Sequence, residues 1–414
     1  MRRIIIAINI ILLVWGEPAY MEPYDKIQPI VSETSEPRDS LRSSSKTSQA
    51  KGKFLNLITW VKFTNDECSA STGENGTCYT TQECTEFGGK ASGTCASGFG
   101  VCCVLQYSCG TRTNKNSTYF VNDNYPSGYN RIGQCSITVE KVAADVCQLR
   151  LDLDVMDIQQ PDPQTHQCTI DRFVVTGGSP VPIICGYNSG QHMYIDAGSG
   201  NSPCSLTFIT TGDYNRTFKM KITQIECGAV NRAFEGCLQY YNEVSGVISS
   251  FNYIQAEGLQ LSNQDYTICI RNERGFCGIS YRACEDKLGS HALQESFTIT
   301  GNSLKQPTTQ GEVRVGDNCT TDWVAIPCAT TSTDGSAVQF PGSSPKSCVD
   351  RLCGEVFCSV TDHPKKSSPC SVYSYTRPFT VRVHFDTDEI GDGEGESADN
   401  RGFCLSYVQQ PCTS

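Results

Sequence analysis

Apolar and polar side chains alternate along several short stretches of the chain. Residues 147–155 read Cys-Gln-Leu-Arg-Leu-Asp-Leu-Asp-Val, and residues 379–385 read Phe-Thr-Val-Arg-Val-His-Phe. Shorter runs of this kind occur at 171–175, 206–208 and 218–222. A period of two predicts strands with one buried face and one face in water. The pattern therefore predicts an all-β chain whose core is lined by the apolar members of these runs.

The stretch 109–208 combines such strands with cysteines and turn residues. Its landmarks, in order, are Cys109, Asn124-Tyr125-Pro126, Tyr129, Cys135, the strand at 147–155, Cys168-Thr-Ile-Asp171 and Cys185-Gly186. Short strands, turn signals and cysteines at this spacing indicate an antiparallel sandwich pinned by disulfides.

This order of landmarks resembles a CUB domain, an extracellular jelly-roll sandwich. The family pairs its first cysteine with its second and its third with its fourth. The resemblance thus implies the disulfides Cys109–Cys135 and Cys168–Cys185. It leaves two additional cysteines, Cys147 and Cys204, to pair with each other.

The stretch 237–407 repeats this order of landmarks, with residues that match the first stretch less closely. Cys237 and Cys269 flank Ser-Phe-Asn-Tyr at 250–253, and Cys319-Thr-Thr-Asp322 corresponds to Cys168-Thr-Ile-Asp171. Cys353-Gly corresponds to Cys185-Gly. The repeat implies the pairs Cys237–Cys269 and Cys319–Cys353. The expected domains are a CUB-like domain at 109–226 and a second one at 227–414, enlarged by insertions near 285–316 and 329–376.

Residues 67–108 form a smaller module with six cysteines and many glycines. So short a segment has too little core to fold without cross-links. Its terminal Cys102-Cys103 pair resembles the clip domain of arthropod secreted proteases and their inactive relatives. That resemblance implies the pairs Cys68–Cys102, Cys78–Cys95 and Cys84–Cys103. A metal site is the alternative, but disulfides consume thiolates in an oxidising compartment.

The first 66 residues differ from the rest. Arg2-Arg3 followed by an apolar run predicts a signal peptide over residues 1–16. A membrane anchor is the alternative, although the run falls well short of the roughly 20 residues that span a bilayer. Residues 17–66, polar over most of their length, predict a disordered leader or propeptide, with Lys51-Gly-Lys53 as a processing site or an inert linker.

Composition narrows the class of protein. A net charge of -11 argues against nucleic acid as a partner. Twenty-five cysteines indicate secretion into an oxidising compartment. Counted from Cys227, thirteen cysteines fall in the second CUB-like domain, so one thiol is either buried and free or bonded to another chain. The oligomeric state stays open.

The chain lacks the common catalytic motifs. It has no Gly-x-Ser-x-Gly turn, no His-Glu-x-x-His helix and no phosphate-binding glycine loop. Its five histidines are scattered, and His384 on an alternating strand is expected to be solvated. The sequence therefore predicts a protein that is not an enzyme.

Calcium is the candidate cofactor. Many CUB domains hold Ca²⁺ with a Glu ahead of the third cysteine, the Asp of Cys-x-x-Asp, and an Asp after the late strand. In the second domain Asp322 and Asp388 match, with Asp317 or Glu312 as stand-ins for the Glu. Calcium needs several oxygen ligands. The alternative is a solvated acidic loop, made of Asp386, Asp388, Glu389, Asp392, Glu394, Glu396 and Asp399.

The first domain is the poorer calcium candidate. Asp171 matches the family pattern, but Gln159 stands where the Glu belongs, and Asp213 is a loose third. Four sequons predict glycans on the surface, at Asn75, Asn116, Asn215 and Asn318.

Together these features predict a secreted, non-enzymatic recognition protein that binds extracellular protein or glycan partners through its CUB loops. The alternatives are a non-catalytic regulator of an extracellular protease cascade and a structural matrix or cuticle protein.

Overall fold

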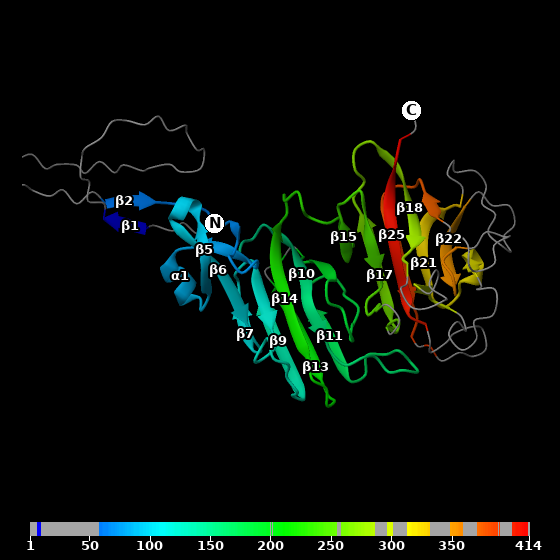
Figure 1. The fold of residues 1–414 in the computed structure, drawn as a ribbon, viewed down its shortest axis with the longest axis horizontal. Helices are drawn as coiled ribbons and strands as arrows, with labels where there is room; N and C mark the ends of the chain where they lie inside the picture. The colour runs from blue at the N-terminus through cyan, green and yellow to red at the C-terminus, as the bar shows by residue number, and fades with distance from the viewer. Residues whose placement is uncertain are drawn as a thin grey trace, which may run out of the picture. The chain divides into compact units, whose positions relative to one another are not determined.

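A computed structural model describes residues 6–9, 58–198, 200, 202–254, 258–285, 296–300, 313–331, 348–358, 371–387, 389 and 400–412. The chain divides into two compact units, residues 1–105 and residues 106–414. Each is described by itself. The fold is all-β, as the alternation predicted, and the larger unit contains the strands from β7 to β25 (Figure 1).

The smaller unit is a set of antiparallel strands tied by three disulfides. Its elements are β3 (Glu67–Ser69), β4 (Asn75–Tyr79), α1 (Thr81–Glu86), β5 (Lys90–Cys95), η1 (Ala96–Gly98) and β6 (Gly100–Tyr107). β4 and β5 both pair with β6. A capping box between Thr80 and Glu83 starts α1. The disulfides are Cys68–Cys102, Cys78–Cys95 and Cys84–Cys103, the connectivity that the clip resemblance implied.

Close packing around these disulfides explains one of the glycines. A Cβ at Gly89 would overlap the Sγ of Cys103 and would also approach Leu105. Because glycine has no Cβ, the connection between α1 and β5 can pass directly over the Cys84–Cys103 bridge. Cystine therefore replaces much of the core that so short a segment lacks.

Two further strands precede this module. β1 (Ile6–Asn9) pairs antiparallel with β2 (Ile58–Val61). The sequence predicted a signal peptide and a disordered leader there, so these two strands were not foreseen. Residues 10–57 lie outside the described part of the chain.

The larger unit begins with a first sandwich of two sheets. In one sheet, β14 (Thr217–Glu226) lies between β8 (Thr118–Val121) and β10 (Val146–Asp157), and β12 (His192–Asp196) pairs with β10. The other has the order β11 (Asp171–Thr176), β13 (Cys204–Thr210), β9 (Gly133–Val139), β7 (Thr111–Thr113). The rings of Phe208 on β13 and Phe218 on β14 stack at 3.8 Å, so the two sheets meet face to face.

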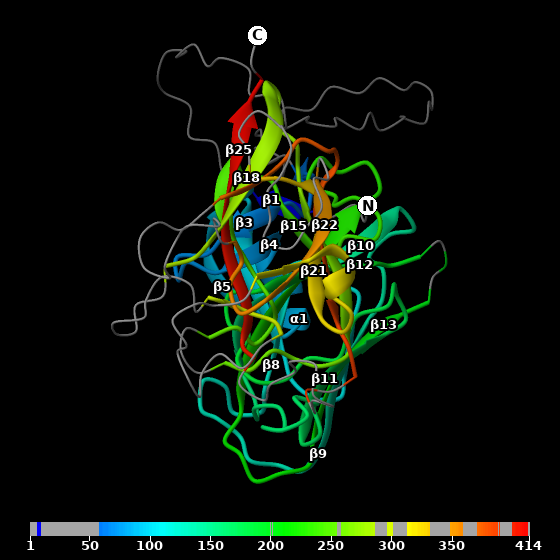
Figure 2. The same ribbon diagram turned by 90° about the vertical axis from the view of Figure 1, so that its right-hand side faces the viewer.

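A second sandwich follows it. One sheet has the order β15 (Gln239–Tyr241), β17 (Gln264–Ile270), β24 (Phe379–Phe385), β21 (Trp323–Ala329), β22 (Val349–Gly354), β20 (Val313–Val315). The other has the order β16 (Ser245–Ser249), β25 (Gly402–Pro411), β18 (Phe276–Ala283), β23 (Val372–Ser374), with β19 (Phe297–Thr298) also on β25. Figure 2 shows β25 and β18 lying side by side.

The predicted alternation holds on β24 and breaks within β10. On β24, Phe379, Val381, Val383 and Phe385 are all buried. On β10 the alternation is broken by an irregular pairing with β14 between Asp152 and Val155. As a result Met156 is fully buried while Val155 is only half-buried. A β-bulge inserts a residue and reverses which side chains point inward, and the sequence pattern did not reveal it.

Four disulfides in the sandwiches have the partners implied by the CUB resemblance and the repeat: Cys109–Cys135, Cys168–Cys185, Cys237–Cys269 and Cys319–Cys353. Among the described residues the structure also forms Cys277–Cys412, Cys284–Cys404 and Cys328–Cys348, which were not predicted.

The predicted pair Cys147–Cys204 is wrong. Cys147 bonds Cys227 instead, with their Cα atoms 4.8 Å apart, because β10 and β14 are neighbours in one sheet. Cys204 lies on β13 in the opposite sheet, where it is buried and free. Burial raises the pKa of the Cys204 thiol to about 12, so this thiol is protonated and unreactive at neutral pH. Cys227, counted above with the second domain, is thus tied to the first sandwich.

Candidate functional site

The aspartate of each Cys-x-x-Asp motif starts a strand and is fully buried. Asp171 begins β11, and Asp322 directly precedes β21. Their exposed fractions are 1% and 0%. A carboxylate so deep needs a positive partner or several hydrogen-bond donors. The two sandwiches meet this need in different ways.

In the first sandwich the partner is a guanidinium group. Arg216, also fully buried, donates from Nε to Asp171 Oδ2 at 2.6 Å and from Nη2 to Asp171 Oδ1 at 2.7 Å. Its remaining hydrogens reach the carbonyl oxygens of Tyr214 and Gly212. The backbone N–H of Gln159 also donates to Asp171 Oδ2 (2.9 Å). Both carboxylate oxygens are therefore in use.

A cation does not fit there. Arg216 already neutralises Asp171 from within the protein, and a second positive charge would be repelled by the guanidinium. Gln159 contributes only its backbone N–H, and Asp213 accepts from Asn130 instead of facing Asp171. The three residues named from the sequence for this domain do not form a calcium site.

In the second sandwich the carboxylate of Asp322 lies beside a second carboxylate. Asp322 Oδ1 accepts from the backbone N–H of Asp386 at 2.7 Å, and Oδ2 accepts from Gln260 Nε2 at 2.9 Å. The same Nε2 donates to Glu389 Oε1, while Asn400 Nδ2 donates to Glu389 Oε2 at 3.0 Å. We call Asp322, Glu389, Gln260 and Asn400 the acidic cluster.

The acidic cluster has more acceptors than donors. Gln260 Nε2 carries two hydrogens but faces three acceptors: Asp322, Glu389 and the carbonyl oxygen of Ile299. The side-chain oxygens of Gln260 and Asn400 are buried without a hydrogen-bond partner in the described part of the chain. Burial, and then the charge of Asp322, raises the pKa of Glu389 to about 9. Glu389 therefore carries a proton at neutral pH, and a cation that binds here must displace it.

These residues fit a hard cation. Two carboxylates and two amide oxygens are ligands that Ca²⁺ prefers. Within the described residues no group of three or more His, Cys, Asp or Glu side chains is arranged to hold a metal, so the amide oxygens matter. Asp388 and Glu312 lie outside the described residues, and Asp317 is exposed on η3 (Gly316–Asn318).

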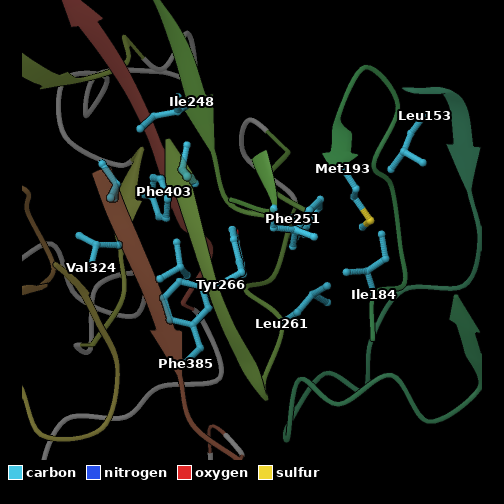
Figure 3. Packing of buried hydrophobic residues seen from close by; sticks show 14 of the residues in the cluster. Leu153, Ile184, Met193, Ile248, Phe251, Leu261, Tyr266, Val324, Phe385 and Phe403 are labelled. Atoms are coloured by element: carbon cyan, nitrogen blue, oxygen red, sulfur yellow. The ribbon is translucent and has the colours of Figure 1, made fainter. Parts of the chain in front are cut away.

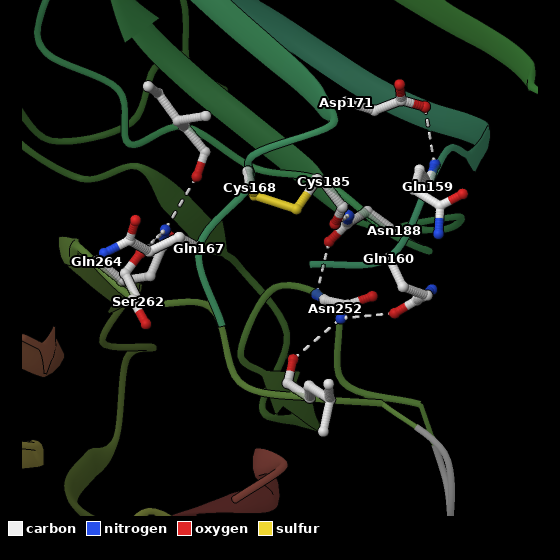
Figure 4. Close-up of a disulfide and its surroundings, with 12 residues drawn as sticks. Gln159, Gln160, Gln167, Cys168, Asp171, Cys185, Asn188, Asn252, Ser262 and Gln264 are labelled. Carbon is white, nitrogen blue, oxygen red and sulfur yellow. Dashed lines mark hydrogen bonds between the residues drawn. A yellow bond between two sulfur atoms is a disulfide. The ribbon is translucent and has the colours of Figure 1, made fainter. Parts of the chain in front are cut away.

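The acidic cluster adjoins the seam between the two sandwiches. Its neighbours along the chain, Ser262 and Gln264, donate to carbonyl oxygens of the first sandwich, Thr165 and Ile183. Figure 4 shows this seam beside the Cys168–Cys185 disulfide, with Asn252 reaching toward Gln160 and Asn188. Apolar side chains from both sandwiches continue the contact in one cluster (Figure 3).

The seam also includes backbone pairing. Tyr194 on β12 donates its N–H to the carbonyl oxygen of Leu238 at 2.7 Å. The ring of His192 lies within hydrogen-bond distance of both backbone groups of Tyr240. Burial lowers the pKa of His192 to about 4, so its imidazole is neutral at physiological pH. The two sandwiches are therefore joined by a built interface.

Other residues named from the sequence fall in various places. His384 is stacked on Trp323 at 4.8 Å and is not simply solvated. Among the sequons, Asn215 and Asn318 are exposed, whereas Asn75 and Asn116 are half-buried. Sequence reasoning missed Arg216, Gln260 and Asn400 as partners of the carboxylates, and it took Glu389 for a surface charge.

Comparison with known proteins identifies part of the chain. Residues 235–410 match the family model of the animal CUB domain. The protein therefore contains a CUB domain, which includes the acidic cluster. A search of curated proteins found no match. In the described part of the chain, no helix has the length and apolar character that crossing a membrane would require.

Three solved structures are similar at low identity. The CUB1-EGF-CUB2 domains of rat MASP-1 are 13% identical over 72% of this chain and 99% of that one, with a TM-score of 0.23. The corresponding domains of human MASP-1/3 are 15% identical over 70% and 98%, with a TM-score of 0.21. The extracellular region of zebrafish Gpr126/Adgrg6 is 13% identical over 74% and 38%, with a TM-score of 0.25.

Proposed function

We propose that this CUB-containing chain is a secreted, non-enzymatic recognition protein that binds extracellular protein or glycan partners through the loops of its sandwiches. The CUB match over residues 235–410 carries the proposal, because the family is generally non-catalytic. The density of disulfides supports an oxidising, extracellular location. We include the first sandwich as a second CUB-like domain.

The described histidines support a binding role. His166 lies buried near Glu389, His192 is bonded to the backbone of Tyr240, and His384 is stacked on Trp323. Each of these contacts serves packing or the seam, and those of His192 and His384 in the described part of the chain include no Ser or Cys side chain. A nucleophile activated by a histidine is the arrangement that hydrolases most often use.

The smaller unit favours the second candidate function. Its three disulfides have the connectivity of a clip domain, which in arthropod secreted proteins accompanies proteases. A clip-like module joined to CUB-like domains suits a non-catalytic regulator that docks to a protease cascade. A structural matrix protein is the third candidate.

Cross-linked capture from extracellular fluid tests these functions. The full chain, immobilised and washed in Ca²⁺, is expected to retain a defined protein or glycan that EGTA releases. Recovery of proteases would favour the cascade regulator, and retention on insoluble chitin or matrix would favour the structural protein. Hydrolytic activity of the purified chain toward the captured partner would contradict the proposal.

We further propose that the CUB domain binds one Ca²⁺ at the acidic cluster. The carboxylates of Asp322 and Glu389 would hold it, together with the amide oxygens of Gln260 and Asn400 once both amides turn so that oxygen replaces Nε2 and Nδ2 beside the carboxylates. Asp388, named from the sequence, stays a predicted ligand. The ion would replace the proton of Glu389 and balance the negative charge of the two adjacent carboxylates. It would thereby fix the loops that carry these residues.

Calorimetric titration of the full chain with Ca²⁺ is expected to give one saturable site, with a dissociation constant on the order of 10⁻⁴–10⁻³ M as in other extracellular modules. Asp322→Asn should abolish this heat. The matched control is Asp350→Asn, which changes an exposed aspartate on β22 of the same sandwich and should bind like the wild type.

The pH dependence has a defined sign. Burial raises the pKa of Glu389 to about 9, whereas Ca²⁺ needs the ionised carboxylate, so binding must release a proton. Affinity should therefore rise as the pH increases toward about 9. No saturable heat, or equal heat from Asp322→Asn, would remove calcium from this site.

A further inference from the structure

A loop of the first sandwich lies against the acidic cluster of the second. Thr165 and His166 offer their carbonyl oxygens to Ser262, which donates from Oγ at 2.6 Å and from its N–H at 3.1 Å. Gln167 Nε2 donates to the carbonyl oxygen of Thr387 at 2.8 Å. His166 Nδ1 lies 3.9 Å from Glu389 Oε1, and both side chains are buried. We call residues 162–167 the docking loop.

The docking loop holds its own shape. Asp162 Oδ1 accepts from the N–H groups of Gln164 and Thr165 and from the Thr165 hydroxyl. The chain closes on itself through His166 N–H to Asp162 O and Asp162 N–H to Gln167 O, both at 2.9 Å. The neighbouring Cys168–Cys185 disulfide anchors its end. The loop therefore presents its carbonyl groups without needing the second sandwich to order it.

Two segments of the second sandwich contact both the loop and the cluster. Along one, Gln260 bonds the carboxylates while Ser262 bonds the docking loop. Along the other, Glu389 belongs to the cluster while Thr387 receives Gln167. Asn263 ties the two segments together, since its side chain donates to the carbonyl oxygen of Thr387 at 3.2 Å. In each segment the residue that belongs to the acidic cluster is therefore only two positions from the residue that bonds the docking loop.

We infer that cation binding at the acidic cluster and docking of the two sandwiches are coupled, so that each stabilises the other. This inference rests on the calcium proposal above. An ion that fixes Glu389 and Gln260 also fixes Thr387 and Ser262, which the docking loop binds. Coupling free energies are reciprocal, so a weaker seam must lower the affinity for the ion by the same factor. The ion then sets how rigidly the two sandwiches present their loops to a partner.

The test weakens the seam without touching a proposed ligand. In the full chain, Gln167→Ala removes the bond to Thr387 and should weaken Ca²⁺ binding by about two- to tenfold, the range for one lost hydrogen bond. Gln164→Ala is the matched control, because this exposed side chain in the same loop makes no contact with the second sandwich in the described structure. It should bind Ca²⁺ like the wild type.

Hydrogen exchange at the Ser262 amide supplies a second readout. This N–H donates to His166 O across the seam, so its exchange should slow in Ca²⁺ and quicken in EGTA. Saturable Ca²⁺ binding that is equal in all three proteins, with Ser262 exchange unaffected by the ion, would overturn the coupling and leave the calcium proposal intact. Absence of Ca²⁺ binding by the wild type would overturn both.

Discussion

Arg216→Ala is expected to lower the free energy of unfolding of the larger unit by about 3–5 kcal/mol, the cost of leaving one partner of a buried ion pair alone. Asp171 would keep a buried charge with only the Gln159 N–H as a donor. The carbonyl oxygens of Tyr214 and Gly212 would also lose their donors. Urea unfolding of the full chain, followed by tyrosine or tryptophan fluorescence, measures the loss.

An exposed ion pair of the same chemistry is the matched control. Arg382 donates to both oxygens of Asp265 at 3.1 and 3.0 Å, yet the two side chains are 56% and 53% exposed. Arg382→Ala should cost less than about 1 kcal/mol. The double variant Arg216→Met with Asp171→Leu should recover most of the stability, because neither charge remains. Equal losses at Arg216 and Arg382 would contradict the role given to burial.

The contrast between the two carboxylate sites follows from one difference in sequence. Both sandwiches place an aspartate of a Cys-x-x-Asp motif in their interior, and in the first a buried arginine bonds it. The second brings a glutamate and two amides. A guanidinium group built into the chain thus supplies the positive charge beside Asp171, and under the calcium proposal above Ca²⁺ would supply it beside Asp322.

The sequence predicted the strands well because their signal is local. Period-two runs place side chains on alternate faces whatever the tertiary context, as the four buried side chains of β24 show. The bulge in β10 escaped prediction because it depends on how β10 pairs with β14, a partner about 70 residues away.

The disulfides of the sandwiches were predicted from the sequence only in part. The CUB resemblance implied two pairs in the first domain, and the repeat carried them to two more in the second, since equivalent cysteines in two copies of a fold have equivalent partners. The second sandwich also contains the equivalent of the Cys147–Cys227 bond. There, Cys277–Cys412 joins the start of β18 to the end of β25, as Cys147–Cys227 joins the start of β10 to the end of β14. Pairing by elimination gave Cys204 instead, although that cysteine lies in the opposite sheet.

The candidate site was predictable only in part. Asp322 could be found from its motif, but neutral amides such as Gln260 and Asn400 have no characteristic spacing. Glu389 looked like one charge in a solvated loop, although it is 3% exposed. The seam could not be predicted at all, since it joins residues in the 160s to residues in the 250s and 260s that no sequence motif relates.

Asn252→Ala is expected to destabilise the larger unit by about 2–4 kcal/mol and to separate the thermal unfolding of the two sandwiches. Asn252 is fully buried at the seam, where its Oδ1 accepts from Tyr187 N–H and its Nδ2 donates to Gln160 Oε1 (Figure 4). Alanine would leave the part-buried Tyr187 N–H and Gln160 Oε1 without these partners, at about 1–3 kcal/mol. The backbone at φ 59° adds about 1 kcal/mol, because alanine tolerates the left-handed region poorly.

Differential scanning calorimetry of the full chain in Ca²⁺ measures both effects, with Asn124→Ala as the matched control. Asn124 has a similar φ of 67° but lies exposed in the first sandwich, so its substitution introduces the backbone strain alone. The wild type and this control should unfold the sandwiches in one transition, and Asn252→Ala in two, because the seam would no longer make them cooperative. Asn252→Gly should recover the stability lost to backbone strain, because glycine tolerates positive φ, but not the stability lost with the hydrogen bonds. If Asn252→Ala costs no more than Asn124→Ala and unfolds in a single transition, Asn252 does not hold the sandwiches together.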